Sequence, residues 1–362
     1  MADGSHIEWT DATWNPITGC SVVSPGCANC YAMKLAGTRL KHHPSREGLT
    51  IDTKAGPVWN GQVRLNEQWL DQPLRWRRPR MIFVCAHGDL FHESVPDEWI
   101  DRVFAVMALS PQHTFQVLTK RSSRMRAYMS AARAHPVALA ALEVALEQHV
   151  LNSNSTVGKG CIIQGDIAHL QQWPLRNVWL GISAEDQRRA DERIPDLLET
   201  PAAVRFLSIE PLLGPIDFYK TSAAMPGWPS HQHPWRNGPI LQGIHWVIVG
   251  GESGDRARPM HPDWARLLRD QCARARVPLF FKQWGNWAPG ECANKAPTRT
   301  ERVATLWSDI DEPVKWNYGT LTPRQSEEVH CDEEPDVYWL GKKSAGRWLD
   351  GVEHNAMPER RP

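Results

Sequence analysis

Short apolar runs that alternate with helical patterns limit the fold of this chain more than any other feature. Six runs rich in β-branched or aromatic residues have the pattern of strands buried on both faces. They span 81–86, 115–119, 178–183, 204–210, 245–251 and 278–284. Helical patterns lie between several of them, over 96–110, 184–199 and 261–276. Because buried strands that alternate with helices form parallel sheets, we predict an α/β fold with a full or partial TIM-barrel-like parallel barrel.

Two irregular stretches and a tail interrupt this alternation. We predict a barrel over 1–285 with a loop insertion at about 131–172, where a helical pattern precedes a polar, turn-rich stretch. A second stretch, 220–239, is rich in Pro, Gly and His and has the composition of a long surface loop. Beyond 286 the pattern gives way to Pro-rich and acidic sequence. We therefore expect 286–362 to be a C-terminal extension that packs on the barrel.

Composition narrows the class of protein. The 362 residues carry a formal net charge of zero and contain no apolar run of the about 18 residues that a membrane helix needs. The first ten residues lack the basic and apolar regions of a secretory signal, so we expect a cytoplasmic protein. In a reducing compartment the eight cysteines favour a metal or catalytic site over a disulfide framework.

Cys20, Cys27 and Cys30 are the strongest candidate site, because they lie close together in the sequence with no fourth cysteine nearby. A structural zinc site normally takes four protein ligands. A [4Fe–4S] cluster held by three thiolates leaves one iron open, and that iron can chelate S-adenosyl-L-methionine. The sequence also allows a helix to begin at Cys27 and Cys30. The alternative is a zinc or structural cluster site completed by a distant ligand such as Cys85 or a histidine.

Nine sequence blocks, in order along nearly the whole chain, resemble an uncharacterised family of phage and bacterial proteins known for a three-cysteine motif. The blocks are WNPITGCSVVSPGCANCYA, LFH, VLTKR, NVWLGISAEDQ, RFLSIEPLLGPID, WVIVGGESG, ARPM, FFKQWG and GKKSAGRWLDG. The resemblance implies a radical-SAM-like protein with a TIM-barrel-type fold. This chain departs from the commonest radical enzymes, which place three and then two residues between their cysteines, whereas six and then two intervene here.

Polar residues at the ends of the predicted strands are candidate ligands of S-adenosylmethionine. The stretch Gly250, Gly251 and Glu252 is similar to the Gly-Gly-Glu strand end with which radical enzymes hold the methionine amino group. A tight turn at a strand end is the alternative. Ser183 and Glu185 are placed to meet ribose hydroxyls, although a helix N-cap also explains Ser183. A buried carboxylate needs a partner, so Glu210 is a further candidate.

The candidate catalytic residues are Cys85, Asp89 and Lys282, each at or just beyond the end of a predicted strand. A thiol at Cys85 could donate a hydrogen atom to a product radical, as a thiol does in radical enzymes that repair DNA photoproducts; a small core residue is the alternative. His87, Asp89 and His92 could instead bind a second metal, which would make the protein a metal-dependent hydrolase. Ordinary polar residues at a barrel mouth also explain these three.

Two basic segments are candidate nucleic-acid contacts, because they flank consecutive strands and could contact phosphates. Their basic side chains are Arg75, Arg77, Arg78, Lys120, Arg121 and Arg124. Charge runs are more often a solvated face, and the zero net charge gives no general attraction to nucleic acid. The 18 tryptophans leave open both an aromatic core and surfaces that stack on bases.

Together these features predict a radical S-adenosylmethionine enzyme with a [4Fe–4S] cluster. The sequence does not identify its substrate; a nucleobase of DNA or RNA is one candidate, and the function would then be repair or modification of the nucleic acid. We expect as partners a flavodoxin-like or ferredoxin-like electron donor, a DNA or RNA substrate and a separately encoded protein. The alternatives are a non-catalytic zinc-binding or iron–sulfur protein that binds nucleic acid or a partner, and the metal-dependent hydrolase.

Overall fold

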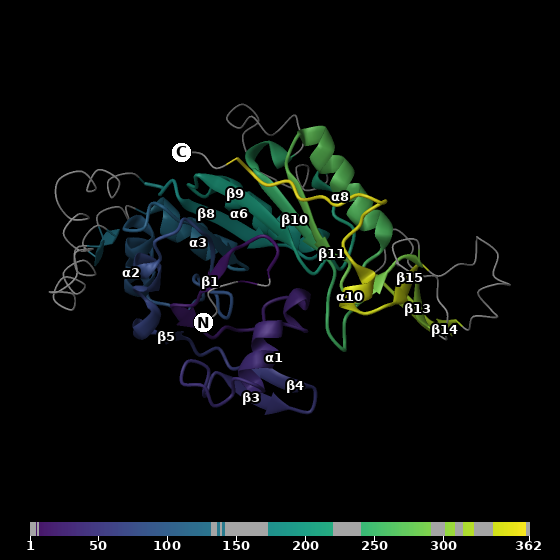
Figure 1. Cartoon of the computed structure of the whole chain (residues 1–362), viewed down its shortest axis with the longest axis horizontal. Coiled ribbons are helices and arrows are strands. Elements are labelled where there is room, and N and C mark those ends of the chain that lie inside the picture. The colour runs from purple at the N-terminus through teal and green to yellow at the C-terminus, as the bar shows by residue number, and fades with distance from the viewer. Residues whose placement is uncertain are drawn as a thin grey trace. The chain divides into compact units, whose positions relative to one another are not determined.

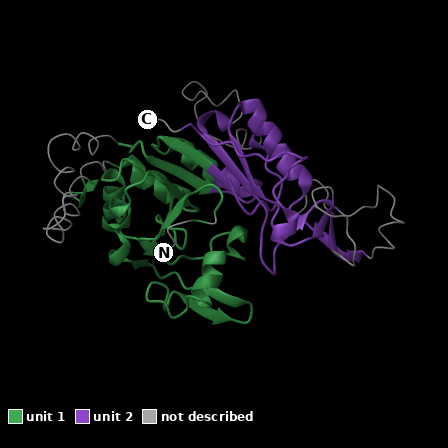
Figure 2. Cartoon of the chain, viewed as in Figure 1, with its two compact units in different colours: residues 1–182, 193–206, 360–362 green, residues 183–192, 207–359 purple. Residues whose placement is uncertain are grey.

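The computed structural model describes most of the chain (Figure 1). The described residues are 5, 7–131, 136–137, 140–141, 173–219, 240–290, 301–307, 314–321 and 336–359. The predicted loop at 220–239 and most of the predicted insertion lie outside them. Figure 2 colours two compact units, one of 1–182, 193–206 and 360–362, the other of 183–192 and 207–359. The predicted domain boundary at 285 stays a prediction.

A seven-stranded sheet carries the fold, and its strands follow the order β1-β6-β7-β8-β9-β10-β11. The strands are β1 (Ala12–Trp14), β6 (Met81–Val84), β7 (Thr114–Thr119), β8 (Val178–Ser183), β9 (Val204–Ile209), β10 (Trp246–Gly250) and β11 (Leu279–Gln283). The pairs β1–β6, β6–β7, β7–β8 and β10–β11 are parallel. All six predicted strands are confirmed, and the sheet is consistent with a partial TIM-barrel-like α/β fold. Sequence patterns missed β1, which has only three residues.

Helices connect these strands, as the alternation predicts. They are α2 (Asp97–Ala108), α3 (Ser122–Ser130), α6 (Gln187–Glu199) and α8 (Pro262–Ala275). The start of α8 follows from its sequence, because Nδ1 of His261 accepts a hydrogen bond from the Asp263 amide at 3.2 Å and Pro262 needs no amide partner. Its apolar face buries Cys272, as the helical pattern indicates. Among the described residues, no helix is long and apolar enough to cross a membrane.

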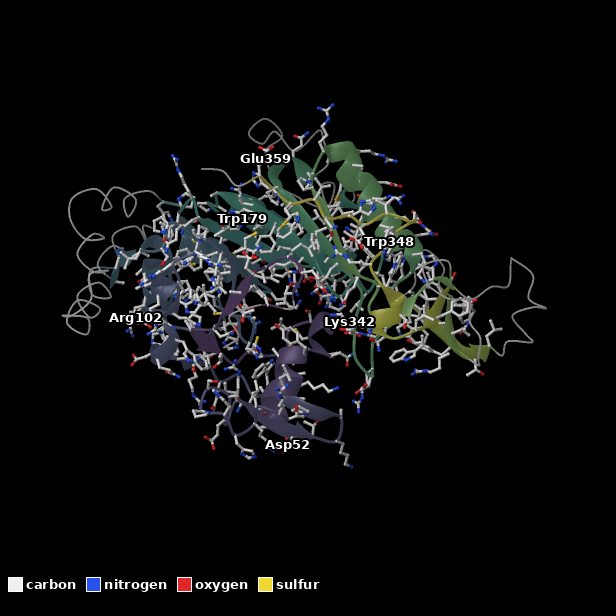
Figure 3. The ribbon with its side chains drawn as sticks, viewed as in Figure 1. Asp52, Arg102, Trp179, Lys342, Trp348 and Glu359 are labelled. Carbon is white, nitrogen blue, oxygen red and sulfur yellow. The ribbon has the colours of Figure 1, made fainter. Side chains whose placement is uncertain are left out.

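The strands are buried along their length, which explains their nearly continuous apolar sequence. Every residue of β8 and of β10 is buried. Gly181 in β8 leaves room for the ring of Phe206, because a Cβ at that position would lie 2.5 Å from the ring. Trp179 on β8 is only 3% exposed, whereas Trp348 near the C-terminus is 49% exposed (Figure 3). Some tryptophans are therefore part of the core, and others lie on the surface.

Small elements in the first unit build the surroundings of the cysteines. Two antiparallel pairs form there, β2 (Ile17–Thr18) with β5 (Arg64–Leu65) and β3 (Thr50–Thr53) with β4 (Gly56–Trp59). The short helices are η1 (Pro25–Cys27), α1 (Tyr31–Gly37), η2 (Glu67–Trp69) and η3 (Gln72–Arg75). A hydrophobic cluster of Ala32, Met33, Ala36, Leu49 and Trp59 joins α1 to this region, and Cys20 and Cys30 pack against it.

A four-stranded antiparallel sheet lies in the second unit, in the order β12-β15-β13-β14. Its strands are β12 (Trp287–Ala288), β13 (Glu301–Leu306), β14 (Trp316–Leu321) and β15 (Val337–Trp339). The alternation of strands and helices does end near 286, and sequence patterns did not reveal the antiparallel sheet that follows it. Its strands carry mixed polar and apolar residues, because one antiparallel face can be exposed to water. The short helix α10 (Lys342–Ala345) follows this sheet.

The segment 354–356 runs along β11. The Phe281 amide donates to the His354 carbonyl at 2.9 Å, and the Ala356 amide donates to the Leu279 carbonyl at 3.2 Å. The indole of Trp246 also donates to the Ala356 carbonyl at 2.9 Å. Backbone groups of β11 that face away from β10 therefore have partners within the chain.

Candidate functional site

The loop that carries the three cysteines follows β1 and the short strand β2. It is held at Gly19, whose amide donates to the His87 carbonyl at 3.2 Å in the loop after β6. Gly19 has a φ of +96°, and a Cβ there would lie 2.2 Å from the Gln62 carbonyl oxygen. Only glycine fits this backbone and this close approach. The fold thus fixes the position of Cys20, the next residue.

Cys27 and Cys30 lie where short helices end and begin, as the sequence indicates. Cys27 is the last residue of η1, and Cys30 is the N-cap residue of α1. The Cys30 amide donates to the Cys27 carbonyl at 3.2 Å, and the Lys34 amide donates to the Cys30 carbonyl at 3.0 Å. Backbone hydrogen bonds therefore keep these two cysteines one turn apart.

The three thiols are near enough to interact electrostatically. Burial raises the pKa of the Cys20 thiol to about 12, and Asp89, Cys30 and Cys27 raise it further while Arg121 opposes them. Burial also raises the pKa of Cys30, and the Cys27 charge adds to the shift. Within the described ranges, no group of three or more His, Cys, Asp or Glu side chains is arranged to hold a metal ion. Coordination by all three thiols would require their side chains to turn.

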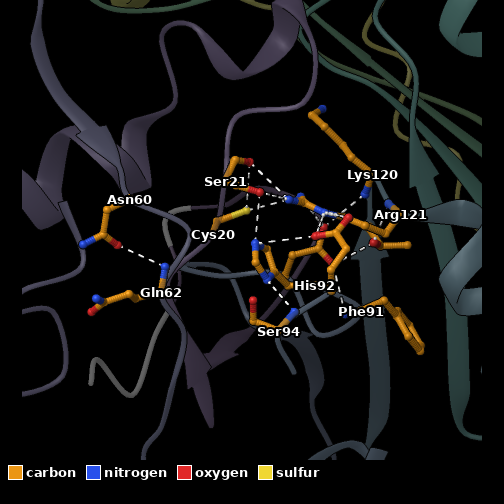
Figure 4. A network of polar contacts seen from close by, with 12 residues as sticks. Cys20, Ser21, Asn60, Gln62, Phe91, His92, Ser94, Lys120 and Arg121 are labelled. Atoms are coloured by element: carbon orange, nitrogen blue, oxygen red, sulfur yellow. Dashed lines mark hydrogen bonds and ion pairs between the residues drawn. The ribbon is translucent and has the colours of Figure 1, made fainter. Parts of the chain in front are cut away.

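Arg121 and Asp89 form a buried ion pair beside Cys20 (Figure 4). The Arg121 guanidinium donates to Asp89 at 3.2 Å and to the Sγ atom of Cys20 at 3.3 Å. Asp89 also accepts hydrogen bonds from Thr119 Oγ1 at 2.6 Å, the Phe91 amide at 3.0 Å and the Lys120 amide at 3.2 Å. Both charges are therefore fully hydrogen-bonded, which a buried pair requires.

The same guanidinium holds the residue after Cys20. Arg121 donates to the Ser21 hydroxyl at 2.6 Å and to the Ser21 carbonyl at 3.2 Å. The Ser21 hydroxyl also contacts Nε2 of His92 at 3.0 Å, and Nδ1 of His92 accepts from the Ser94 amide at 3.1 Å. Burial and the Arg121 charge lower the pKa of His92. One connected network therefore anchors the Cys20 side of the loop (Figure 4).

Cys85 and His87 lie in the loop after β6. Cys85 is buried in the left-handed region with a φ of +56°, and its amide donates to the Trp14 carbonyl at 2.7 Å. Burial raises the pKa of its thiol to about 12. Burial and the charge of Arg46 lower the pKa of His87 to about 4, so its imidazole is neutral at physiological pH. The strained backbone at Cys85 is typical of functional sites.

In the second unit, Glu210 at the end of β9 pairs with Lys282 of β11. The Nζ–Oε1 distance is 3.0 Å, and the Ser208 hydroxyl donates to the other carboxylate oxygen at 3.3 Å. Gly250 at the end of β10 makes room for this carboxylate, because a Cβ there would lie 2.6 Å from Oε1 of Glu210. The fold thus brings together three of the predicted residues, Glu210, Gly250 and Lys282.

The rest of the Gly-Gly-Glu stretch has partners inside the protein. A Cβ on Gly251 would lie 1.9 Å from the Trp284 carbonyl oxygen, so a close approach of two backbone segments requires this glycine. The Glu252 carboxylate takes two hydrogen bonds from the Arg258 side chain, at 2.9 and 2.6 Å, and one from the Arg258 amide at 2.9 Å. The geometry around these two residues is thus also explained by packing and an ion pair.

The remaining predicted ligands, Ser183 and Glu185, lie at the end of β8 and just beyond it. Both are buried, and the Glu185 carbonyl accepts from the Leu213 amide at 2.7 Å. Whether any of these residues contacts a cofactor stays a prediction.

The six basic residues differ in their exposure. Arg75, Arg77 and Arg78 are exposed, and Arg75 pairs with Asp71 at 2.9 Å. Lys120 is partly buried, and Arg124 donates to Asp97 at 2.5 Å. Arg121 is buried in the network described above. The Arg121 guanidinium therefore contacts Asp89 and Cys20 inside the protein. A nucleic-acid surface would have to be formed by the other five predicted basic residues.

The side chains of Ser21, Glu93 and Thr119 contribute to this network and were not among the predicted site residues. Glu93 contacts Nε of Arg121 at 3.3 Å; burial raises the pKa of Glu93, but a backbone hydrogen bond and the Arg121 charge together lower it below its ordinary value. Ser21 gave a weak signal, since it directly follows a predicted ligand. Nothing in the sequence connected Glu93 to the cysteine loop, because the contact passes through Arg121.

A model of one protein family matches residues 4–358, which is nearly the whole chain. The printed description of that family is "Protein of unknown function (DUF5131)". No curated protein and no solved structure matches the chain.

Proposed function

The chain belongs to the DUF5131 family, and we propose that it is an iron–sulfur enzyme of the radical S-adenosylmethionine type. In this proposal Cys20, Cys27 and Cys30 hold a [4Fe–4S] cluster. The observation that carries it is the position of three mutually interacting thiols on the loop after the first strand of a parallel α/β sheet. Loops that follow the carboxyl ends of strands are where such folds place their chemistry.

The donor set fits this cofactor chemically. Thiolates are the protein ligands of iron–sulfur clusters, and bound metal deprotonates a coordinating thiol outright even where burial has raised its pKa. Cys20 and Cys30 pack against one apolar cluster, which limits the access of water. Arg121 places a positive charge beside Cys20, which offsets part of the negative charge that three thiolates would bring.

A reduced cluster with one open iron supplies an electron to bound S-adenosylmethionine, and the protein supplies binding and orientation. In the second unit Glu210 is the residue best suited to hold a cationic ammonium group, since its carboxylate already accepts from the ammonium of Lys282. Ser183 and Glu185 are the proposed contacts to ribose hydroxyls. Gly250, Gly251 and Glu252 would contact the methionine end.

The proposed catalytic residues are Cys85, Asp89 and Lys282. Cys85 has a protonated thiol at neutral pH, as a donor of a hydrogen atom must. Asp89 acts through Arg121 and positions Cys20. Lys282 would hold a proton near Glu210. We propose a nucleobase of DNA or RNA as substrate, contacted by the exposed Arg75, Arg77 and Arg78, and a flavodoxin-like or ferredoxin-like protein as electron donor.

The hydrolase alternative has less support. The Asp89 carboxylate accepts four hydrogen bonds, and both ring nitrogens of His92 have hydrogen-bond partners. The buried Nδ1 atom of His87 has no hydrogen-bond partner among the described residues. These three side chains are therefore not arranged as one ligand set in this structure.

The test is anaerobic reconstitution of the full chain with iron and sulfide, followed by reduction with S-adenosylmethionine. The readouts are the iron content per chain, the electron paramagnetic resonance spectrum and the amount of 5'-deoxyadenosine formed. A variant with Cys20, Cys27 and Cys30 all changed to alanine is the metal-site control, and C272A, a change at a buried cysteine in α8, is the matched cysteine control.

The proposal predicts a cluster signal and deoxyadenosine in the wild type and in C272A, and neither in the triple variant. Stoichiometric zinc with no cleavage of S-adenosylmethionine would overturn the proposal and favour the non-catalytic binding protein. Loss of a hydrolytic activity on changing His87, Asp89 and His92 to alanine, with that hydrolytic activity fully kept in the triple cysteine variant, would favour the hydrolase.

A further inference from the structure

The guanidinium of Arg46 is buried in the first unit without an acidic partner. Arg46 is only 4% exposed. Its NH1 group donates to the Ser45 hydroxyl at 2.6 Å and to the Ser45 carbonyl at 3.4 Å, while its buried Nε atom has no hydrogen-bond partner. No carboxylate of the described residues pairs with it. An ionised side chain in this position normally has a counter-charge, because burial of an unpaired charge is costly.

The groups around Arg46 do not neutralise it. The nearby thiol of Cys85 has its pKa raised to about 12 by burial, so it is uncharged at neutral pH. Arg64 adds a second positive charge near Arg46, and its guanidinium donates to the Glu47 carbonyl at 2.8 Å. Burial, with this second arginine, lowers the pKa of Arg46 to about 10, which still leaves it protonated at neutral pH. The Trp69 ring, whose centroid lies 6.0 Å from Cζ of Arg46, offsets part of this positive charge, but no carboxylate of the described residues pairs with it.

A chain of hydrogen bonds connects Arg46 to His87. The Thr18 hydroxyl donates to the Ser45 carbonyl at 2.6 Å, and Nδ2 of Asn66 donates to the same hydroxyl at 3.3 Å and to the Asn15 carbonyl at 3.1 Å. The side chain of Asn15 in turn accepts the His87 amide at 2.9 Å. This chain ends on the backbone amide of His87, and the Arg46 charge is near enough to the His87 ring to act on it electrostatically, so we treat the two residues as one polar cluster.

This cluster holds unsatisfied polar atoms on three residues. Besides Nε of Arg46, these are Nδ1 of His87 and Oδ1 of Asn66, which are buried and lack partners. Asn66 itself is only 1% exposed. A neutral imidazole can donate from one nitrogen, so His87 can supply a donor without adding charge. Buried polar atoms nearly always have partners, so the two unpaired groups that can donate, Nε of Arg46 and Nδ1 of His87, indicate a missing acceptor, whereas Oδ1 of Asn66 is itself an acceptor and does not bear on an anion.

We infer that Arg46 and His87 form a binding site for a small oxyanion, the carboxylate or phosphate group of a ligand. An oxyanion supplies the missing negative charge and accepts from Nε of Arg46 and Nδ1 of His87. A water molecule would satisfy the hydrogen bonds but would leave the charge uncompensated. The planar guanidinium suits both carboxylate and phosphate, which it binds through two parallel hydrogen bonds.

The test uses the full-length metal-free protein, so its outcome does not depend on the proposed cluster. The melting temperature is measured against inorganic phosphate and against acetate, with sodium chloride at matched ionic strength as the salt control. Isothermal titration calorimetry with phosphate and with acetate gives the affinities. The variants are R46M, R46K and H87F, and R102M, at a surface arginine paired with Glu67, is the matched control.

We expect phosphate or acetate, but not chloride, to raise the melting temperature of the wild type and of R102M. Phosphate alone would indicate a phosphoryl ligand, and acetate alone a carboxylate ligand. R46M should weaken binding by about tenfold or more, with R46K between it and the wild type. R46M should also be at least as stable as the wild type without oxyanion, since it removes a buried unpaired charge.

Two results would overturn the inference. One is an equal response of the wild type to phosphate, acetate and chloride, which would mean a general effect of ionic strength. The other is an R46M variant destabilised to the same extent with and without oxyanion, which would mean that Arg46 is satisfied by its contacts to Ser45 and has only a structural role.

Discussion

The guanidinium of Arg121 donates a hydrogen bond to the Sγ atom of Cys20 at 3.3 Å, although the two residues are 101 positions apart in the sequence. Arg121 follows β7, and Cys20 lies on the loop after β1 and β2. A sulfur that accepts a hydrogen bond from a cation is held in place and has its negative charge stabilised.

Arg121→Met should strongly destabilise the protein. It would leave Asp89 as a buried carboxylate without its cation, and the loss of one partner from a buried pair costs about 3–5 kcal/mol. Urea unfolding measures the change in free energy. Arg124→Met is the control, because Arg124 forms a more exposed pair with Asp97 and its loss should cost less than about 1 kcal/mol. Equal losses in the two variants would contradict the central role of Arg121.

Gly19→Ala should disturb the cysteine loop more than Gly61→Ala does. Both glycines have positive φ values, +96° and +84°, so both substitutions strain the backbone by about 1–2 kcal/mol. Only at Gly19 would the new Cβ also collide with the Gln62 carbonyl, since nothing lies within 4 Å at Gly61. We expect lower iron uptake on reconstitution for Gly19→Ala alone. Iron uptake equal to that of the Gly61 variant would show that the loop adjusts freely.

His87 should make the protein less stable in weak acid. Its pKa falls from an ordinary value of about 6.5 to about 4, so between these pH values the unfolded chain binds more protons than the folded protein. Its contribution to stability is complete above pH 6.5 and is lost as the pH falls to 4. The full effect would be at most about 3 kcal/mol, reduced by solvent screening.

Urea unfolding at several pH values measures this effect. His87→Gln should flatten the dependence between pH 4 and 6.5, although His92, His113 and His354 also have lowered pKa values and would leave a residual slope. His42→Gln, at an exposed position, is the matched histidine control. A curve for His87→Gln that matches the wild type would show that His87 titrates normally.

Glu210→Gln should weaken the binding of S-adenosylmethionine by about 10-fold to 100-fold, the loss expected when a ligand ammonium loses a charged hydrogen-bond partner. Equilibrium dialysis with reconstituted protein measures the affinity. The iron content should stay at the wild-type value, because Glu210 is not among the proposed cluster ligands. An unchanged affinity would mean that the carboxylate serves only its pair with Lys282.

The sheet could be predicted from sequence because its strands are buried on both faces and are therefore continuously apolar. The run 246–250 has no polar residue, and all of β10 is buried. The C-terminal sheet gave no such signal. In β14 the four central residues Asn317, Tyr318, Gly319 and Thr320 are exposed, so the strand depends on its pairing with β13. Pairing between distant segments is not visible in local composition.

Prediction of the candidate site from sequence is limited in the same way, because contacts between distant segments are not visible in local sequence. The three cysteines could be grouped from sequence because they are close along the chain. Arg121 was predicted to belong to a basic surface, because it stands in a run of basic residues that resembles a solvated face. It is buried because Asp89, 32 positions earlier, lies opposite it at the end of the neighbouring strand. Which member of a charge run turns inward depends on such tertiary partners.

The segment 354–356 covers an edge of the large sheet that a shortened chain would expose. β11 is an edge strand of the large sheet, and an open edge offers its amides and carbonyls to any other strand. His354 and Ala356 occupy those groups on β11. A chain cut short before them would therefore present a free row of backbone donors and acceptors and would be prone to aggregate through strand pairing. Residues 354–356 therefore protect this edge of the sheet against self-association.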